Sequence, residues 1–485
     1  MTFSPLSLKN VQSGTILFVD NIAAEAIALT GGIKSVVPKV YLSIISIDKH
    51  PKEITSLIQR MNEIAPVEHF EIFIGSLISN YRTQITQIAS IEEYDITRIY
   101  TTNINETGQC LPDKLRNRIE LIPDFYVELV KNISISTTIK TNILEQIAQF
   151  DETQAPNIIN LITRYLKNTG SQQVKCYSIG NFASEIAGDI EKKRHGNPNS
   201  ALLVVDRLYY SAPLFADSDS LLDTFAKTSL FQTIYDKDLL NLELSKGPKG
   251  LLTYIQQLVG SKEPTYDSIC VAWSKLDDQK KIEIESKHKI IAQVFENFKT
   301  SNKKQLQEML FNGEEIKDVL DSAASLKESL DLIGVKRMFS TQLDLETLVQ
   351  KAFSQNRSDA KNFCSPQNAV SILTECRSGF ERNSSPSIKS IFTLTNLIKS
   401  LYNNSGEDDP RIKCAGTGML SGLLNRSKPP TIGSFNEIFV VVLGGLSFQE
   451  VYELGQLINA SNKKKIHILT DTISSTINIF SNRKQ

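Results

Sequence analysis

Close cysteine pairs are missing from this sequence. No two of its six cysteines have the C-x-x-C spacing with which one turn presents two thiolates to zinc. The five histidines are also dispersed and form no HExxH pair. We therefore expect reduced thiols scattered through the core of a cytosolic protein, and no metal site. The cysteines are Cys110, Cys176, Cys270, Cys364, Cys376 and Cys414.

An excess of charge of either sign is missing as well. The chain has 53 Lys and Arg against 54 Asp and Glu, a formal net charge of -1. This balance gives the protein as a whole no attraction for nucleic acid or for anionic lipid, so we expect no nucleic-acid partner. Two basic stretches, 191–199 and 461–465, fall at helix-to-strand junctions and indicate exposed loops, with phospholipid or partner contact as the alternative.

Long hydrophobic runs are absent. The longest apolar run spans 438–446 and is less than half the length of a bilayer-spanning helix. The first ten residues, MTFSPLSLKN, lack the basic and then apolar regions of a secretory signal. We expect a soluble protein whose contact with membranes is only peripheral.

A β-α-β pattern is present in the first part of the chain. Short β-branched runs alternate there with segments whose apolar residues recur at three-to-four spacing, which predicts a parallel sheet covered on both faces. The predicted strands are 14–20, 39–45, 69–75, 96–102 and 118–123, and the predicted helices include 53–65 and 81–91.

A second α/β unit is split in the sequence. Its first half ends in the strand ALLVVD (201–206), and its second half contains the strand at 437–445, a helix at 447–459 and the strand at 465–471. The residues between the halves have almost no strand signal and carry long, charged amphipathic patterns, which predicts an inserted helical domain. The predicted domains are 1–123, 124–210 with 435–485, and the insert 211–434.

Two glycine-rich turns could in principle cradle a phosphate. The stretch 415–424 has the spacing G-x-G-x-x-x-G and follows no clear strand, which favours a flexible loop. Gly444 and Gly445 do lie between a strand and a helix, but Ser447 and Glu450 have the spacing of a capping box, which explains them without a ligand. The chain has no Gly-Lys-Ser/Thr ending of a P-loop. No enzyme class gains support, although a nucleotide-using enzyme built on this turn stays an alternative.

Asp206 and Arg207 directly follow the apolar run of the strand at 201–206. The carboxyl end of a parallel strand is where α/β proteins often place functional groups, which is the active-site interpretation. The structural interpretation is that Asp206 accepts hydrogen bonds from neighbouring backbone amides while Arg207 fastens the end of the strand to the inserted domain. We favour the structural interpretation.

The segment SALLVVDRLYYSAPLF (200–215) resembles the signature of the Sec/Munc (SM) family of SNARE regulators, in which an apolar strand, Asp-Arg and Pro-Leu lead into an inserted domain. GTILFVDN (14–21), the stretches at 92–103 and 117–130, and EIFVVVLGGLSFQEVYEL (437–454) with KIHILTD (465–471) are similar to further family landmarks in the same order. On this resemblance the signature residues are Asp206, Arg207, Pro213, Gly444, Gly445 and Glu450.

The resemblance implies an α/β fold shaped as an arch, with two parallel-sheet α/β domains and a mainly helical domain inserted into the second. It implies binding of syntaxin-type SNAREs, of SNARE bundles or of tethering-complex subunits during membrane fusion, with no catalysis and no cofactor. The expected protein is a cytoplasmic monomer within a hetero-complex, peripherally associated with secretory or endolysosomal membranes. A scaffold of a tethering complex that has the same fold without SNARE binding is the alternative.

This chain departs from the family pattern at two points. Tyr209-Tyr210 and then ADSDSLLDTF (216–225) stand where the family usually has an acid and an acidic, aromatic-rich stretch, and the chain is short. These departures indicate a divergent subgroup, such as the SM-like proteins linked to endoplasmic reticulum tethers.

In the family, a pocket near the last strands of the N-terminal domain can take a syntaxin N-terminal peptide. The nearest segments here are 99–103 and 119–123, and buried core is the alternative interpretation of both. The resemblance gives as partner-binding residues Ile99, Tyr100, Ile119, Leu121 and Pro123.

Overall fold

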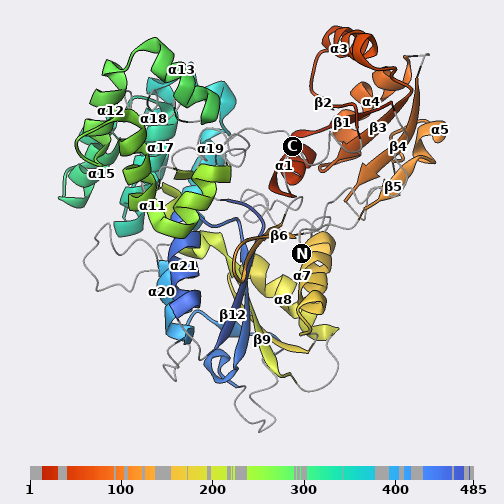
Figure 1. The fold of residues 1–485 in the computed structure, drawn as a ribbon. Coiled ribbons are helices and arrows are strands. Elements are labelled where there is room, and N and C mark those ends of the chain that lie inside the picture. Colours follow the sequence, from red (N-terminus) through yellow and green to blue (C-terminus); the bar gives the residue numbers. More distant parts are fainter. Residues whose placement is uncertain are drawn as a thin grey trace.

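Two arms rise from a central α/β unit in the computed structural model (Figure 1). The N-terminal α/β unit forms one arm and inserted helices form the other, so the predicted fold class is confirmed. The structure describes residues 14–30, 41–91, 94–102, 108–122, 126–136, 155–171, 173–193, 198–215, 220, 222–223, 237–288, 291, 295, 303–340, 342–376, 393–402, 409–416, 430–460, 464–473 and 480.

The N-terminal unit is a five-stranded parallel sheet in the order β2-β1-β3-β4-β5. Side chains alternate between its faces, as the pleat of a strand requires. One face packs against α3, α4 and α5, and the other packs against α1. The elements are β1 (Thr15–Val19), α1 (Asn21–Thr30), β2 (Ser43–Ser46), α3 (Pro51–Ile64), β3 (His69–Ile74), η1 (Ile78–Tyr81), α4 (Arg82–Ala89), β4 (Asp95–Thr101), α5 (Asp113–Arg116) and β5 (Ile119–Leu121).

The second unit is a seven-stranded sheet in the order β10-β8-β9-β11-β12-β7-β6. Its five middle strands are parallel, and the edge strands β10 and β6 are antiparallel to their neighbours. The strands before and after the insert, β9 and β11, lie side by side, so the two halves separated in the sequence form one sheet. The strands are β6 (Tyr126–Val130), β7 (Ile133–Ser136), β8 (Val174–Ile179), β9 (Ser200–Asp206), β10 (Lys413–Cys414), β11 (Glu437–Leu443) and β12 (Lys465–Thr470).

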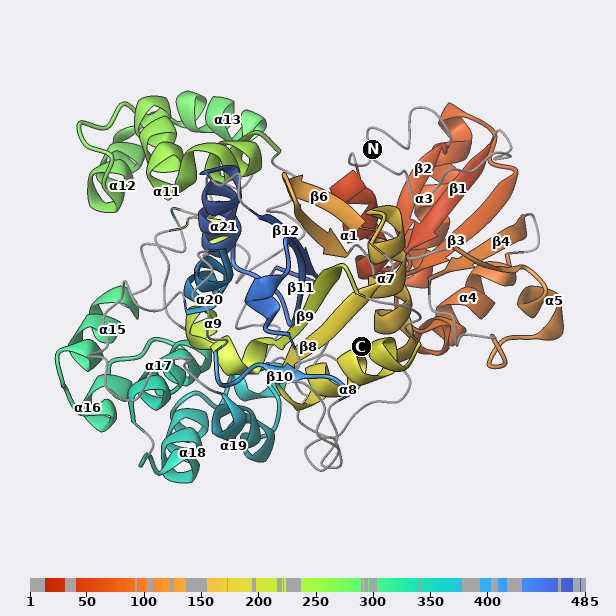
Figure 2. The same cartoon turned by 90° about the horizontal axis from the view of Figure 1, so that it is seen from below.

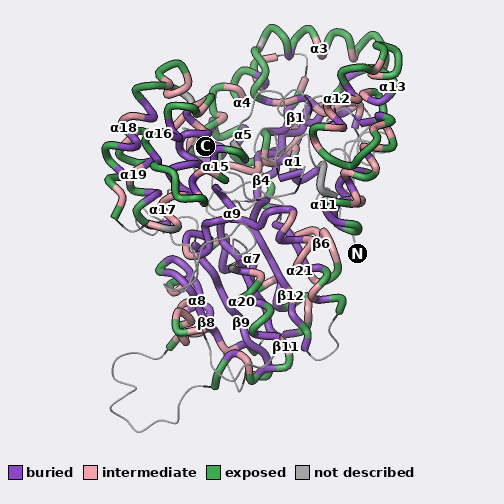
Figure 3. Tube along the Cα trace, turned by 90° about the vertical axis from the view of Figure 1, so that its left-hand side faces the viewer, coloured by how far each residue is buried: buried purple, intermediate pink, exposed green. Residues whose placement is uncertain are grey.

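Helices cover both faces of this second sheet. The helices α7 (Ala155–Asn168) and α8 (Asn181–Lys192) pack on one face. On the other face lie α20 (Thr393–Tyr402) and α21 (Phe448–Ala460), together with the first inserted helices. The five middle strands are therefore buried along most of their length, whereas the edge strands β6 and β10 are partly exposed, as are the outer surfaces of α3, α12 and α13 (Figure 3).

The inserted helices form two packed groups (Figure 2). The first group shares the core of the second sheet and comprises α11 (Lys237–Val259), α12 (Tyr266–Lys275) and α13 (Asp278–Lys287). The second group has its own core with α9 (Ala212–Phe215), and comprises α15 (Lys303–Phe311), α16 (Ile316–Leu320), α17 (Leu326–Phe339), α18 (Leu345–Gln355) and α19 (Pro366–Glu375). Short 3-10 turns are η2 (Arg207–Tyr210), η3 (Ala360–Asn362) and η6 (Ile432–Ser434).

The last part of the predicted insert returns to the second sheet. Strand β10 pairs with β8 at the sheet edge, and apolar side chains of α20 lie in the sheet's core. The sequence had no strand signal there because β10 has only two residues. The domain boundaries stay a prediction. Several segments discussed above lie outside the described residues, among them 194–197, 216–219, 224–225, 417–424 and 461–463.

All six cysteines are free; Cys176, Cys364 and Cys376 are buried as expected, whereas Cys110, Cys270 and Cys414 are partly exposed. None of the helices within the described ranges is long and apolar enough to cross a bilayer.

Candidate functional site

Strand β9 ends at the junction where the chain leaves the second sheet. All seven of its residues are buried, because the strand lies between β8 and β11 in the middle of the sheet. Asp206 is only 3% exposed and Arg207 is not exposed at all. Two charged side chains inside the protein need internal partners, since burying an unpaired charge is costly.

The partner of Arg207 is Glu450 on α21. The two guanidinium nitrogens Nη1 and Nη2 donate to the two carboxylate oxygens over 2.9 and 2.7 Å, and both side chains are completely buried. The expectation that Arg207 fastens the strand to the inserted domain is wrong. Because β9 and β11 are neighbours, α21 begins beside the end of β9, and Arg207 joins the two halves of the second α/β unit.

Glu450 also belongs to the predicted capping box. Its Oε2 accepts from the Ser447 amide over 2.9 Å, and the Ser447 Oγ accepts from the Glu450 amide over 3.1 Å, which confirms that prediction. Asp223, near the start of the predicted insert, accepts from the amides of Phe448 and Gln449 over 2.6 and 3.3 Å. Protein acceptors thus occupy the first amides of α21.

Gly444 and Gly445 form the turn before this helix. Their φ angles are 99° and 93°, a region that side-chain-bearing residues rarely adopt, so the turn requires glycine. The Gly444 amide donates to Oδ1 of Asp471 over 2.9 Å. A phosphate site at a helix N-terminus needs free amide donors. The occupied amides of this turn and of α21 therefore argue against the nucleotide-binding alternative.

Asp206 interacts with α8 on the side of the sheet opposite to α21. Its carboxylate accepts from the backbone amides of Phe182 and Ala183, as the structural interpretation predicted. The turn at Gly180, with φ of 107°, brings the backbone so close that a Cβ there would overlap the Asp206 carboxylate. Burial raises the pKa of Asp206 to about 7, and its Oδ1 has no hydrogen-bond partner among the residues that the structure describes.

Pro213 follows the junction in the short helix α9. It is buried with its neighbours Leu214 and Phe215, and Phe215 packs against Gly334 of α17. This turn therefore leads the chain from the second sheet into the core of the second helical group.

The residues predicted to bind a partner occupy very different environments. Ile99 and Tyr100 are completely buried in the N-terminal sheet, so neither side chain can contact a partner and both assignments are corrected. Their side chains point to opposite faces of an interior strand. Apolar periodicity in the sequence does not distinguish a strand that is buried in the core from one that lines a pocket. Ile119 is partly buried, Leu121 is 50% exposed at the edge strand β5, and Pro123 lies outside the described residues.

A buried polar cluster beside β5 was not found from the sequence. Oε2 of Glu71, in the middle of β3, accepts from the Tyr41 hydroxyl over 2.7 Å, and Arg98 lies 3.9 Å from its other oxygen. Arg98 also donates to the Tyr100 hydroxyl over 3.2 Å and lies 3.8 Å from the exposed Glu120. Burial raises the pKa of Glu71, of Tyr41 and of Tyr100. The only sequence signal was a charged residue inside the apolar strand HFEIFI.

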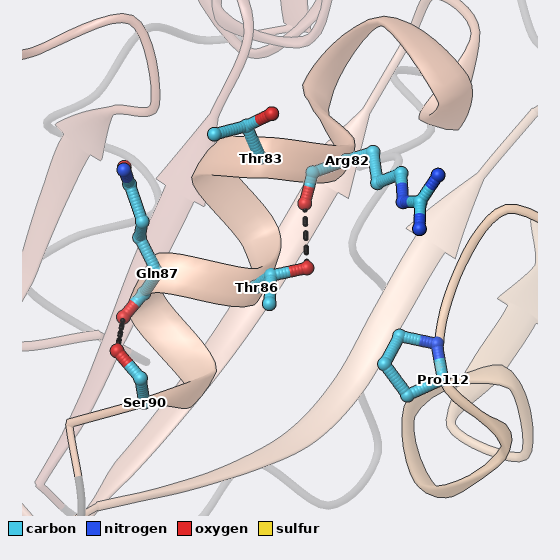
Figure 4. Close-up of a pocket in the computed structure, with 6 residues that line it drawn as sticks. All are labelled: Arg82, Thr83, Thr86, Gln87, Ser90 and Pro112. Atoms are coloured by element: carbon cyan, nitrogen blue, oxygen red, sulfur yellow. Dashed lines mark hydrogen bonds between the residues drawn. The ribbon is translucent and has the colours of Figure 1, made fainter.

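A shallow pocket lies on the opposite, helix-covered face of the same unit (Figure 4). It has a volume of about 370 Å³ and is lined by Arg82, Thr83, Thr86, Gln87 and Ser90 of α4 and its end, and by Pro112. The Thr86 and Ser90 hydroxyls donate to the backbone carbonyls of Arg82 and Gln87 in the same helix. Most of the lining residues have polar side chains, one of them the cation of Arg82, although apolar atoms supply most of the pocket surface.

The sequence matches no protein-family model and no curated protein. Its structure is similar to solved SM proteins over nearly the whole chain. The SM protein Vps45 in complex with the Qa SNARE Tlg2 is 12% identical, with a TM-score of 0.50 over 98% of this chain and 95% of that chain. Vps45 in complex with Tlg2 (1–310) is 11% identical, with a TM-score of 0.50 over 98% and 94%. The Unc18-syntaxin 1 complex from Monosiga brevicollis gives 10% identity and a TM-score of 0.49 over 99% and 97%.

The predicted resemblance is therefore confirmed at the level of the fold. This chain has the fold of the SM proteins, with a very different sequence.

Proposed function

We propose that this protein is a non-enzymatic, SM-like regulator of intracellular vesicle docking and fusion that binds syntaxin-type SNAREs. The single observation that carries the proposal is the match of 98% of the chain to an SM protein that was solved in complex with a Qa SNARE. The junction residues support it, because the Asp-Arg and Gly-Gly positions of the sequence signature hold the architecture together and perform no evident chemistry. Affinity would come from apolar side chains at domain surfaces rather than from a catalytic cleft.

For the N-terminal unit we propose the outer edge at β5 as a partner contact. Leu121 is one of the few large apolar side chains that are at least 45% exposed in the described part of the chain, and Ile119 lies beside it on the same side of the strand. The pocket on α4 lies on the face of the sheet to which Ile119 contributes. We propose that a peptide contacts the apolar side chains of the β5 edge, with the side chains around the α4 pocket as further contacts on the same face.

The test is a pull-down with purified full-length protein against a panel of syntaxin cytosolic regions and tethering-complex subunits. Retention of at least one syntaxin-type SNARE is expected. Failure to retain any member of the panel would sink the proposal. A control panel of unrelated helical bundles distinguishes specific retention from nonspecific binding of exposed coiled coils.

A scaffold of a tethering complex with the same fold is the second candidate. The departures at Tyr209-Tyr210 and in 216–225 favour it, because they alter the segment that leads into the insert. Syntaxins lacking their N-terminal peptides distinguish the two candidates. An SM-like regulator that uses the β5 edge loses affinity for the truncated proteins, whereas a scaffold binds its tether subunits and is indifferent to the truncation.

We further propose that the protein is cytoplasmic and associates peripherally with secretory or endolysosomal membranes. Its divergent sequence favours the subgroup that works with tethering complexes at the endoplasmic reticulum. Imaging of the tagged protein at its endogenous level tests this proposal. A diffuse or nuclear distribution that does not overlap any membrane marker would contradict it.

A further inference from the structure

Glu243 is a completely buried carboxyl group on α11, in the first group of inserted helices. The Ser220 hydroxyl donates to its Oε1, and the Leu222 amide donates to its Oε2 over 3.2 Å. Ser220 and Leu222 lie near the start of the insert, in the segment between α9 and α11, which we call the connecting segment. Glu243 therefore ties α11 to this connecting segment.

The same connecting segment is tied to the second α/β unit. The Asp223 amide donates to the Ser220 Oγ over 2.9 Å, and the Asp223 carboxylate caps α21 through the Phe448 amide. The capping box of α21 then leads through Glu450 to Arg207 at the end of β9. Hydrogen bonds, linked through the backbone of the first turn of α21, thus connect the inserted helix α11 to the end of β9 in the second sheet.

This network of hydrogen bonds contains more acidic than basic side chains. The charged groups around Glu243 include Asp223 in the connecting segment, Glu450 and Glu453 on α21, Arg207 after β9, and Asp238, Lys246 and Lys249 on α11 itself. Of these, the Asp223 carboxylate acts on Glu243. Arg207 is committed to Glu450 by the paired hydrogen bonds described above. Burial, with the nearby Asp223 charge, raises the pKa of Glu243 to about 8. Glu243 therefore carries a proton at neutral pH while α11 is docked.

Apart from these hydrogen bonds, α11 packs on the second α/β unit through apolar side chains that share the core of the sheet and of α21. At Gly247 the chain of α11 turns with a φ of 75°, and a Cβ there would overlap the ring of Tyr452 on α21. A close apolar contact of this kind tolerates small rotations but supplies no directional bond. The hydrogen bonds of Glu243 are thus the directional link that holds this end of α11 in place.

We propose that Glu243 is a proton-operated latch that docks the α11–α13 helices on the second α/β unit. The docked form holds the proton of Glu243, and the undocked form exposes this carboxyl group to water, where it ionises. Undocking therefore releases one proton and becomes easier as the pH rises. The latch acts on the protein's shape and does not depend on which partner the protein binds.

The pH window follows from the two protonation equilibria. An exposed glutamic acid ionises near pH 4.3, and the docked Glu243 ionises near pH 8. Between these values the undocking constant rises about tenfold for each pH unit, and above about pH 8 it becomes constant because both forms are ionised. Docking of α11 is therefore most stable at acidic pH, and the undocking constant already changes with pH around neutrality.

Hydrogen-deuterium exchange of the full chain tests the latch. Protection factors, corrected for the intrinsic effect of pH on exchange, are measured for the amides of α11 at pH 6, 7, 8 and 9. In the wild type, protection of α11 falls about tenfold per pH unit from pH 6 to 8 and then levels off. In Glu243→Gln, a neutral side chain of the same shape, this decline is lost. The matched control Glu263→Gln changes an exposed carboxyl before α12 and keeps the decline.

A second variant covers the case in which Glu243→Gln does not fold. The Ser220 hydroxyl favours the ionised form of Glu243, so Ser220→Ala raises its pKa further and moves the levelling-off point to a higher pH. Equal pH profiles for the wild type and Glu243→Gln would overturn the proposal. An unshifted levelling-off point in Ser220→Ala would overturn it as well.

Discussion

Replacing Arg207 with methionine should destabilise the protein severely. The Arg207→Met side chain fills a similar volume but leaves the Glu450 carboxylate completely buried without its two guanidinium donors. Its remaining partner is the Ser447 amide. Removing one member of a buried ion pair costs about 3 to 5 kcal/mol of folding free energy, which is a large share of the roughly 5 to 15 kcal/mol that holds a typical protein folded.

The double variant Arg207→Met with Glu450→Met separates the lost pair from the stranded charge. Replacing both members of a buried pair by apolar groups is often close to neutral. The Nε of Arg207 also finds no acceptor within the described part of the chain, so its removal takes away a donor that is unsatisfied there. The double variant still loses Glu450's half of the capping box, a cost of about 1 kcal/mol. We therefore expect it to be about 2 to 4 kcal/mol more stable than Arg207→Met alone.

Urea denaturation followed by tryptophan fluorescence measures these differences. The chain has one tryptophan, Trp273, which is buried in the core that α12 shares with the second sheet. A cost below about 1 kcal/mol for Arg207→Met would refute the reasoning, because the pair would then behave like an exposed one. A double variant less stable than Arg207→Met would refute it too.

Three further predictions concern the same junction. In the wild type, Asp206 keeps its proton up to about pH 7 in the folded state and loses it near pH 4 in the unfolded state, whereas Asp206→Asn does not titrate. The stability of the wild type should therefore fall relative to Asp206→Asn by roughly 1.4 kcal/mol per pH unit between about pH 4 and pH 7, and the difference should stay constant above about pH 7. The same difference in urea stability at about pH 5 and at about pH 7.5 would contradict this. Asp206→Ala removes the acceptor for two α8 amides and should lower the melting temperature; an unchanged melting temperature with abolished partner binding would instead restore the active-site interpretation of Asp206. Gly444→Ala must place a Cβ on a backbone with φ of 99° and should cost about 1 to 2 kcal/mol in thermal unfolding, whereas Gly433→Ala, whose added Cβ meets nothing within 4 Å, should cost much less.

The strands at the centre of each sheet were the most predictable part of the fold. The strands β9 and β11 are buried on both faces, which requires apolar residues at consecutive positions. Such a continuous apolar run is easily recognised as a strand in the sequence. The hairpin of β6 and β7 was missed. Ser134 and Ser136 are buried within β7, and such small polar residues in a strand give no apolar signal. Asn132, with φ of 63°, makes the turn between these strands.

The candidate site was predictable only where its contacts are local. Ser447 and Glu450 are three residues apart, so the capping box could be recognised from spacing. Arg207 and Glu450 are separated by 243 positions, and their pairing depends on β9 and β11 becoming neighbours in the folded sheet. The same holds for Glu71, whose partner Tyr41 lies 30 positions away. Contacts across a sheet carry no signature in the sequence of either strand.

Binding of the purified full-length protein to syntaxin-type SNAREs tests the central claim most directly. Isothermal titration compares the wild type with Leu121→Asp, which places a charge on the proposed apolar contact at β5, and with Ile64→Asp, which changes another exposed apolar side chain at the end of α3. The account predicts a saturable interaction that weakens tenfold or more in Leu121→Asp and is unchanged in Ile64→Asp. No heat of binding to any SNARE, or equal affinities for all three proteins, would contradict it.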